Sequence, residues 1–257
     1  MRFRACCLGM GYPIGTRIHC GFASVFESWT IERHVRNALM TTPHASPSYA
    51  WLPFAHWHLH RNPFGELTRE QRTEAAVVET ASLQAVLAEP QGAIQFIGHC
   101  GHGKTTHMLA LLACYPQATY VYLPPDGPCP PIPTGTPLFI DEAQRLPWRR
   151  RREVLRRGEP LVLGTHRDLT SSLKRANYRV HTVNVSGKLS AHRLCEILNR
   201  RIALTSLGTG TTPHVDLPMA QRLIDRFGHN VRAIEDFLYE RIQQYSGVTC
   251  GEMRLDD

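Results

Sequence analysis

The sequence predicts an α/β fold: a three-layer sandwich built on a parallel sheet of about five strands and followed by a small all-helical domain. Two observations predict it. Short apolar runs rich in β-branched and aromatic residues alternate with helical or turn-rich segments over residues 93–187, which is typical of parallel sheets. From residue 188 to residue 246 only helical periodicity remains.

Composition sets the broad class of the chain. At 257 residues there is room for one large domain, or for a core domain with a smaller appendage. The eight cysteines include no C-x-x-C pair, which favours reduced thiols and a cytoplasmic location. No apolar run reaches the roughly 18 residues of a membrane span. Glycines and a proline interrupt the first residues, which argues against an export signal.

Both ends of the chain lack periodicity. Residues 1–50 are predicted to be a poorly ordered leader, and residues 247–257 a loose tail. One hypothesis is that Met40 is the biological first residue, because recognisable organisation begins just after it.

Residues 51–92 are predicted to form a linker and a helix ahead of the sheet. Asn62-Pro63 is a turn signal. Thr68 and Gln71 fit a capping box that opens a helix through about Leu87.

Three histidines alternate within this linker, at His56, His58 and His60. On a strand they would share one face and could bind a metal such as zinc. No fourth ligand is indicated, and Trp57 and Leu59 would form a plain apolar face. The structural interpretation is therefore the stronger one.

The stretch Gly98-His-Cys-Gly-His-Gly-Lys-Thr105 satisfies the phosphate-loop pattern G-x-x-x-x-G-K-[ST]. A strand-like run at 93–97 precedes it and a helical run at 108–114 follows it, as the motif requires. Backbone N–H groups and the helix N-terminus would face the phosphates, while Lys104 reaches the β and γ oxygens and Thr105 holds Mg²⁺. Nucleotide contacts are expected from Gly98, His99, Cys100, Gly101, His102, Gly103, Lys104, Thr105 and Thr106.

The third predicted strand ends in two carboxylates. A strand at 118–123 leads into a proline-rich crossover at 124–137, and the apolar run 137–142 ends in Asp141 and Glu142. Ligands of a parallel sheet lie outside the carboxyl ends of its strands, so this pair points to the same crevice as the phosphate loop. Asp141 would hold Mg²⁺, and Glu142 would orient or deprotonate the attacking water. Capping of a following helix is the alternative role.

Two further strands are predicted at 161–166 and 179–185, with a short helix between them. The first ends in Thr165 and His166, where a side chain could touch the γ-phosphate or its water. Residues 165–168 also resemble the guanine-selecting motif [NT]-K-x-D, but the lysine is missing. Helices are then predicted at 190–207, 218–227 and 230–245, with Gly228 as a helix stop and Asn230 as the next N-cap.

In this order, the features resemble the AAA+ branch of P-loop NTPases over about residues 60–245. The phosphate loop resembles Walker A, residues 138–142 resemble Walker B, and Thr165 with His166 occupies the place of sensor 1. The resemblance implies a P-loop NTPase core at 93–187, a helical lid domain at 188–246, and the use of ATP and Mg²⁺. It also implies a homo-oligomer or partner protein, often a ring or filament in which a neighbour's arginine completes the site.

Three further segments contribute to this resemblance. Residues 228–234 resemble the sensor 2 segment of the lid, which would bring Arg232 near the γ-phosphate. Lys174 or Arg175 stands where AAA+ proteins often place an arginine finger, and an ordinary surface charge is the alternative. Residues 62–65 resemble the entry of AAA+ ATPases related to transposition, secretion and replication initiation, where the linker passes the adenine.

One departure from the family concerns the cover of the sheet. The proline-rich segment replaces the helix expected between the second and third strands, and the stretch from Glu142 to the fourth strand is short. We therefore expect one face of the sheet to be thinly covered, so that a partner or a neighbouring subunit supplies the cover.

The net charge of +7 makes an acidic partner possible. A large part of it is local, because residues 149–157 carry six arginines and one glutamate. Contact with nucleic acid or another polyanion is one interpretation, and a solvated face is the other. The arginines are Arg149, Arg150, Arg151, Arg152, Arg156 and Arg157.

Three functions fit these features. The first is an Mg²⁺-dependent ATPase of AAA+ type, a switch or motor subunit of a larger assembly. The second is a non-catalytic nucleotide-binding adaptor or DNA-associated regulator, in which ATP orders the lid. The third is a small-molecule phosphotransferase, against which the acidic strand end and the sensor 2 resemblance both count.

Overall fold

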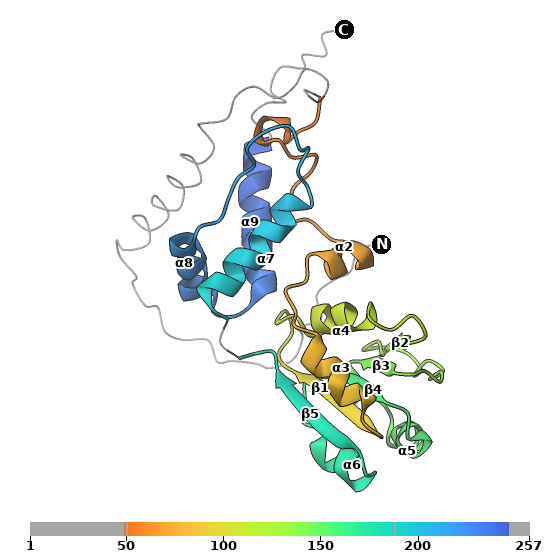
Figure 1. The fold of residues 1–257 in the computed structure, drawn as a ribbon. Helices are drawn as coiled ribbons and strands as arrows, with labels where there is room; N and C mark the ends of the chain where they lie inside the picture. Colours follow the sequence, from red (N-terminus) through yellow and green to blue (C-terminus); the bar gives the residue numbers. More distant parts are fainter. Residues whose placement is uncertain (1–48, 50, 188, 247–257) are drawn as a thin grey trace. The chain divides into compact units, whose positions relative to one another are not determined.

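A five-stranded sheet organises the chain (Figure 1). The structure is a computed structural model that describes residues 49, 51–187 and 189–246; apart from Tyr49, the predicted leader and the predicted tail lie outside the described residues. The strand order is β2-β3-β4-β1-β5, and every neighbouring pair is parallel. The strands are β1 (Gly92–Ile97), β2 (Thr119–Tyr122), β3 (Leu138–Asp141), β4 (Leu161–Thr165) and β5 (Arg179–Asn184). The predicted α/β class and parallel sheet are confirmed.

Burial explains why the three central strands are apolar runs without polar alternation. Every residue of β3 and β4 is buried, as is all of β1 except Ile97. Strands covered on both faces lose the alternating pattern of a half-exposed strand. The edge strand β5 keeps exposed positions, such as Arg179 and His181.

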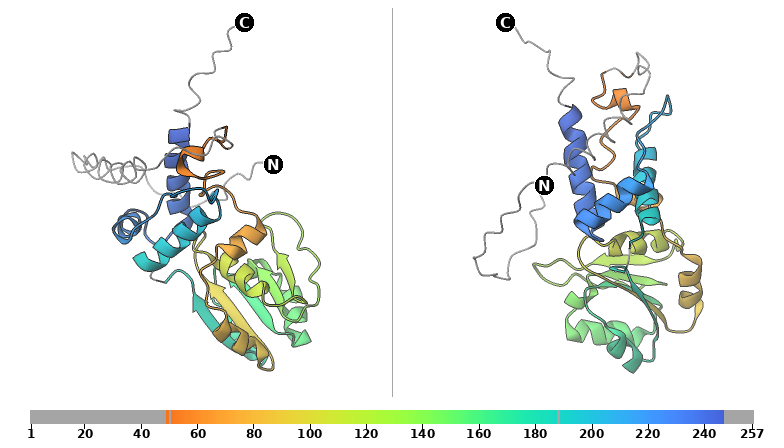
Figure 2. Two further views of the ribbon diagram at one scale, coloured as in Figure 1. Left: turned by 45° about the horizontal axis from the view of Figure 1, so that its top comes forward. Right: turned by 90° about the vertical axis from the view of Figure 1, so that its left-hand side faces the viewer.

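Helices cover both faces of the sheet and give three layers (Figure 2). On one face, α3 (Ala81–Ala88) and α4 (Lys104–Leu112) pack Leu83, Leu87 and Met108 against Phe96 and Phe139. The opposite face is covered by η3 (Ala143–Arg145), α5 (Trp148–Arg157) and α6 (Thr170–Arg175).

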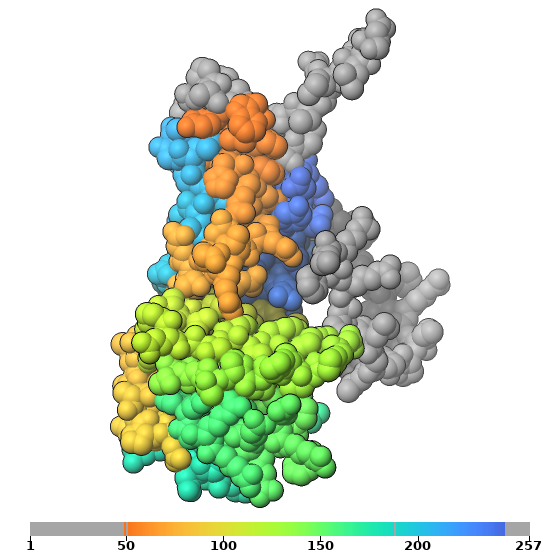
Figure 3. Space-filling view, turned by 90° about the vertical axis from the view of Figure 1, so that its right-hand side faces the viewer, coloured from red at the N-terminus to blue at the C-terminus, as the bar shows by residue number. Residues whose placement is uncertain are grey.

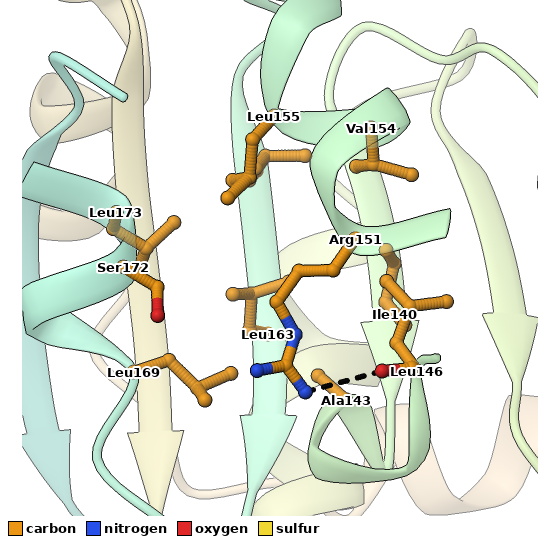
Figure 4. A pocket seen from close by; sticks show the side chains of 11 residues that line it. Ile140, Ala143, Leu146, Arg151, Val154, Leu155, Leu163, Leu169, Ser172 and Leu173 are labelled. Atoms are coloured by element: carbon orange, nitrogen blue, oxygen red, sulfur yellow. Dashed lines mark hydrogen bonds between the residues drawn. The ribbon is translucent and has the colours of Figure 1, made fainter. Parts of the chain in front are cut away.

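The expectation of a thinly covered face is wrong. The proline-rich segment lies on this face and buries Ile132, while Arg157 of α5 donates hydrogen bonds to the carbonyls of Ile132 and Pro133. The helix α5 was not predicted, because its sequence is mostly arginine and its apolar positions are too few to show helical periodicity. Only a cavity of about 20 Å³ remains between α5 and α6, with the Arg151 guanidinium at its edge (Figure 4).

After β5 the described chain forms helices only: α7 (Ala191–Ala203), α8 (Leu217–Phe227) and α9 (Val231–Ser246). Gly228 ends α8 with φ of 62°, a left-handed value that suits glycine. The Asn230 side chain accepts a hydrogen bond from the N–H of Ala233 at 3.2 Å, as an N-cap does. We call α7, α8 and α9 the C-terminal helices.

The helix predicted through Leu87 is two helices. The Thr68 capping box is present and opens α2, which ends after one and a half turns; its bounds are Arg69–Glu74. Residues 75–80 then leave the helix, and α3 begins at Ala81. Val77 and Val78 are β-branched, and the carbonyls of Ala76 and Val77 accept hydrogen bonds from Arg200 and Arg193 of α7. These tertiary bonds replace the helical ones.

The three histidines do not share a strand face. His56 lies in the short helix η2 (Ala55–Trp57), His58 is buried with φ of 56°, and His60 is exposed. The described residues include no group of histidine, cysteine and carboxylate side chains that could hold a metal ion. The shared strand face on which the three histidines would bind a metal is therefore not formed.

Arg201 of α7 connects the segment ahead of α2 (residues 51–67, the N-terminal segment) to α9. It is 5% exposed, donates to the carbonyls of Pro63 (3.0 Å) and Gly65, and forms an ion pair with Glu235 of α9. Figure 3 shows the N-terminal segment, in orange, lying along the blue helices.

Replacing Arg201 should destabilise the fold, because removing one member of a buried ion pair leaves its partner uncompensated. Arg201→Met keeps much of the volume but strands the Glu235 carboxylate and two carbonyl groups, so we expect a loss of about 3 kcal/mol in the free energy of unfolding. Urea denaturation measures it. Arg150→Met, which breaks an exposed pair with Glu153, is the control and should cost less than about 1 kcal/mol. Equal effects of the two substitutions would contradict the role of Arg201.

Candidate functional site

Three strand ends meet at one edge of the sheet. Strand β4 lies between β1 and β3, with Ile97 beside Thr165 and Ile140 beside Leu163. All three run in the same direction, so the glycine-rich loop after β1, the acidic end of β3 and the polar end of β4 are neighbours.

Glycine is required at two positions of the loop. Gly101 has φ of 82° and Gly103 has φ of 87°, and Gly103 is the N-cap of α4. A Cβ at Gly101 would also lie 2.4 Å from Oδ1 of Asn230. On the other side, the His99 N–H donates to Oγ of Ser186 at 2.8 Å. The loop is thus held between the start of α9 and the segment after β5.

Lys104 is buried at the start of α4, with 6% of its surface exposed. Its Nζ donates to the carbonyls of Gly98 (2.9 Å) and His99 (3.1 Å) and lies 3.3 Å from Nε2 of His166. Burial lowers the pKa of Lys104, and the carboxylates of Glu142 and Asp141 oppose this shift. The ammonium group is folded back on the loop, where the loop carbonyls satisfy it.

Asp141 connects the loop to β3. Its Oδ2 accepts hydrogen bonds from the hydroxyls of Thr105 (2.8 Å) and Tyr120 (2.9 Å), and its Oδ1 accepts from the Glu142 N–H (2.9 Å). Burial, and then the Asp141 charge, raise the pKa of Tyr120, so the phenol keeps its proton and donates. The Thr105 hydroxyl and the Asp141 carboxylate are hard oxygen donors, the chemistry that Mg²⁺ prefers.

Glu142 is held in place by three side chains. Its backbone is left-handed, with φ of 61°, which is uncommon outside glycine. Its carboxylate accepts from Gln144 (2.7 Å), pairs with Arg145 (3.2 Å) and lies 3.3 Å from His166 Nε2. The carboxylate therefore faces Lys104 across His166.

At the end of β4, the structure separates the two predicted sensor residues. Thr165 is fully buried, and its hydroxyl donates to the Arg167 carbonyl (2.8 Å) and accepts from the Arg167 N–H (3.0 Å). His166 is the residue that contacts Lys104 and Glu142.

Asp168 accepts a hydrogen bond from the start of α6. Its Oδ1 accepts from the Thr170 N–H at 2.7 Å, at the start of α6, and from Gln95 of β1 at 2.9 Å. Both bonds end on Oδ1 and the residue is exposed, so the guanine-motif interpretation stays a prediction.

A cavity of about 740 Å³ opens beside the loop. The loop, α7, α9 and residues 75–78 line it, and Arg232 is among the lining residues of α9. Arg232 is exposed, and its N–H donates to the Gly101 carbonyl at 3.4 Å, which joins the start of α9 to the loop. The volume is suitable for a nucleotide-sized ligand.

Arg193 of α7 links this cavity's walls. It donates to the Val77 carbonyl at 2.7 Å and lies 3.4 Å from Nε2 of His107, whose Nδ1 lies 2.9 Å from the Gly103 carbonyl. A carbonyl only accepts, so Nδ1 carries the proton and Nε2 accepts from Arg193. This series of hydrogen bonds joins the glycine-rich loop, α4, α7 and residues 75–78.

Some predicted residues lie elsewhere, and some residues at the site were not predicted. Arg175 is exposed at the end of α6, just before β5 begins, at the opposite edge of the sheet from the loop. Tyr120 and Arg145 were missed. Arg145 stands three residues after Glu142, a spacing that often carries ion pairs, whereas nothing in the sequence marks Tyr120 as a partner of Asp141.

Within the described residues, no helix has the length and apolar character required to cross a membrane. Comparison with known proteins found no family model and no curated protein that matches this chain. The fold and the site geometry therefore carry the functional argument.

Gly164 of β4 is predicted to be essential to this geometry. A Cβ there would lie 2.5 Å from Asp141 Oδ1 and 2.6 Å from Met108 Sδ, closer than atoms can approach. Gly164→Ala should therefore cost about 1–3 kcal/mol in the free energy of unfolding, measured by urea denaturation. Gly65→Ala is the matched control, since its nearest contacts would be 3.5 and 3.7 Å. A Gly164→Ala protein as stable as the parent would show that Asp141 has room to move.

Proposed function

We infer that this chain binds ATP with Mg²⁺ and hydrolyses it, as an AAA+ type switch or motor subunit. The observation that carries the proposal is the 2.8 Å hydrogen bond from Thr105 to Asp141. It brings together a hydroxyl at the end of a phosphate-loop sequence and a strand-end carboxylate, with a second carboxylate, Glu142, next in the chain. This is the arrangement that phosphoryl transfer to water requires.

Each residue has a distinct role in this proposal. The loop amides and Lys104 hold the β and γ phosphates once the ammonium group exchanges the Gly98 and His99 carbonyls for phosphate oxygens. Glu142 accepts a proton from the attacking water. The new bond forms between the water oxygen and the γ phosphorus, and the bond from that phosphorus to the β–γ bridging oxygen breaks, which leaves ADP and phosphate.

Thr105 and Asp141 would hold Mg²⁺, which supplies charge neutralisation at the phosphates when it is bound. Arg232 lines the cavity from α9, so its guanidinium is available to the γ-phosphate. The segment 75–78, α7 and α9 line the remaining part, where the base would lie.

The assembly proposal rests on Arg175. At the edge of the sheet opposite the loop, it cannot serve the loop of its own chain. As an arginine finger it would act on a second copy, which makes a homo-oligomer part of the proposal.

A second candidate is the non-catalytic adaptor. The contacts that the Glu142 carboxylate makes with neighbouring side chains favour it. Gln144, Arg145 and His166 all engage the carboxylate, so water activation requires that at least one of them leaves. If this arrangement persists with nucleotide, ATP would be retained without phosphate release.

Two substitutions distinguish these candidates. Glu142→Gln should retain ATP binding and lose phosphate release by at least about a hundredfold, since a general base contributes 10²–10⁴ in rate. Lys104→Ala should lose ATP binding itself. Equilibrium binding of a fluorescent ATP analogue and a phosphate-release assay measure the two properties. Unchanged turnover with Glu142→Gln would exclude this glutamate as the base, and retained ATP with no release from the parent protein would select the adaptor.

Nucleotide affinity should depend on pH through His102. Burial first, and then the nearby side chains of His99, Lys104 and His229, lower the pKa of His102, so it is neutral near pH 7. Protonation below pH 6.5 adds positive charge beside the phosphates, and ATP binding should tighten several-fold towards pH 5.5. The measurement is the affinity of the parent relative to a His99→Gln, His102→Gln variant, because this ratio cancels the titration of ATP. A ratio that stays constant from pH 5.5 to 8 would contradict the prediction.

A further inference from the structure

The outward face of α5 carries a cluster of arginines separate from the nucleotide site. Arg149, Arg152 and Arg156 are spaced three and four residues apart, so they share one face of the helix. All three are exposed. Val154 and Leu155, on the opposite face, pack on the sheet. We call the three arginines, together with Trp148, the α5 surface.

The other arginines of this helix have partners within the protein. Arg150 and Arg157 both bind the Glu153 carboxylate, at 3.1 and 3.0 Å, and these bonds lower the pKa of Glu153. Arg151 donates to the carbonyls of Gln144 and Leu146. By contrast, no carboxylate in the described part of the chain pairs with Arg149, Arg152 or Arg156.

Helix stability does not explain these charges. The first turn of α5 contains arginines and no acidic residue. Positive side chains near a helix N-terminus oppose the helix dipole and repel one another. The arrangement is therefore unfavourable for the isolated fold, and an anion on this surface would relieve it.

Trp148 adds a second feature. It begins α5 and is 67% exposed, and the Arg149 guanidinium lies 5.4 Å from the centre of its ring. A large aromatic side chain beside arginines offers a flat surface on which an unpaired base can stack. A lipid headgroup or an acidic peptide has no such flat base.

We propose that the α5 surface binds single-stranded nucleic acid, with phosphates on Arg149, Arg152 and Arg156 and a base stacked on Trp148. Guanidinium groups bind phosphate with paired hydrogen bonds. From Arg149 to Arg156 the helix rises about 10 Å, which is the length of about three nucleotide steps at 3.4 Å each. The net charge of +7 supports the approach of a polyanion.

The test is fluorescence anisotropy of a labelled oligothymidylate of 20 nucleotides with the full chain and without ATP, so it does not depend on the proposed ATPase. The triple variant Arg149→Gln, Arg152→Gln, Arg156→Gln should bind at least tenfold more weakly. It should also reduce the slope of log affinity against log salt by about 2, since each phosphate contact on a single strand contributes about 0.7. Glutamine keeps helix propensity, so the variant should fold.

Trp148→Ala gives an independent signature. It should weaken binding about tenfold with an unchanged salt slope, because stacking releases no counterions, and Trp148→Phe should recover part of the affinity. A second triple variant, Arg167→Gln, Lys174→Gln, Arg175→Gln, is the control: it removes the same charge from exposed positions around α6 and should bind within about twofold of the parent.

Several results would overturn the proposal. Equal weakening by the two triple variants would mean that net charge alone attracts the strand. Tighter binding to a duplex of the same length, or no effect of Trp148→Ala, would exclude the stacked single strand. Binding to phosphatidylserine vesicles or to poly-glutamate without binding to the oligonucleotide would assign the α5 surface to a membrane or an acidic protein.

Discussion

The hydrogen bond between the Thr105 hydroxyl and the Asp141 carboxylate joins the start of α4, the helix that follows β1, to the end of β3, and β1 and β3 are not neighbouring strands. Strand β4 lies between β1 and β3, so the bond passes over the end of β4. This is possible because β4 has glycine at position 164, where any side chain would collide with Asp141 and Met108. The site therefore depends on a residue that contributes no functional group. A glycine lies where the loop, α4 and the acidic strand end approach one another.

The charged side chains of Lys104, Asp141 and Glu142 all have partners in the structure, which determines how the site can respond to a ligand. Lys104 bonds loop carbonyls, Asp141 accepts three hydrogen bonds, and Glu142 has three partners. Buried charges with partners are stable, and removal of a partner is costly. A phosphate ligand must therefore exchange these bonds for its own. His166 contacts both Lys104 and Glu142, so a change in the hydrogen bonds of Lys104 would also alter the contacts of Glu142.

The sequence predicts the sheet well because fully buried parallel strands leave unbroken apolar runs, and glycine-rich loops leave a fixed spacing. It predicts Asp141 and Glu142 because they end such a run. It could not predict that Thr165 turns away into a hydrogen bond with Arg167, since either side chain at the end of β4 could face the site. It also missed the break at residues 75–80, because that break depends on Arg193 and Arg200, more than a hundred residues later in the chain.

The neutral imidazole of His107 connects α7 to the loop. Burial, together with the charge of Arg193, lowers the pKa of His107. The neutral ring donates through Nδ1 to Gly103 and accepts through Nε2 from Arg193, which also holds the Val77 carbonyl. A protonated ring would have no acceptor for Arg193 and would repel it. Hydrogen bonds therefore connect the glycine-rich loop at Gly103 to α4, to α7 and to residues 75–78, and all four line one cavity.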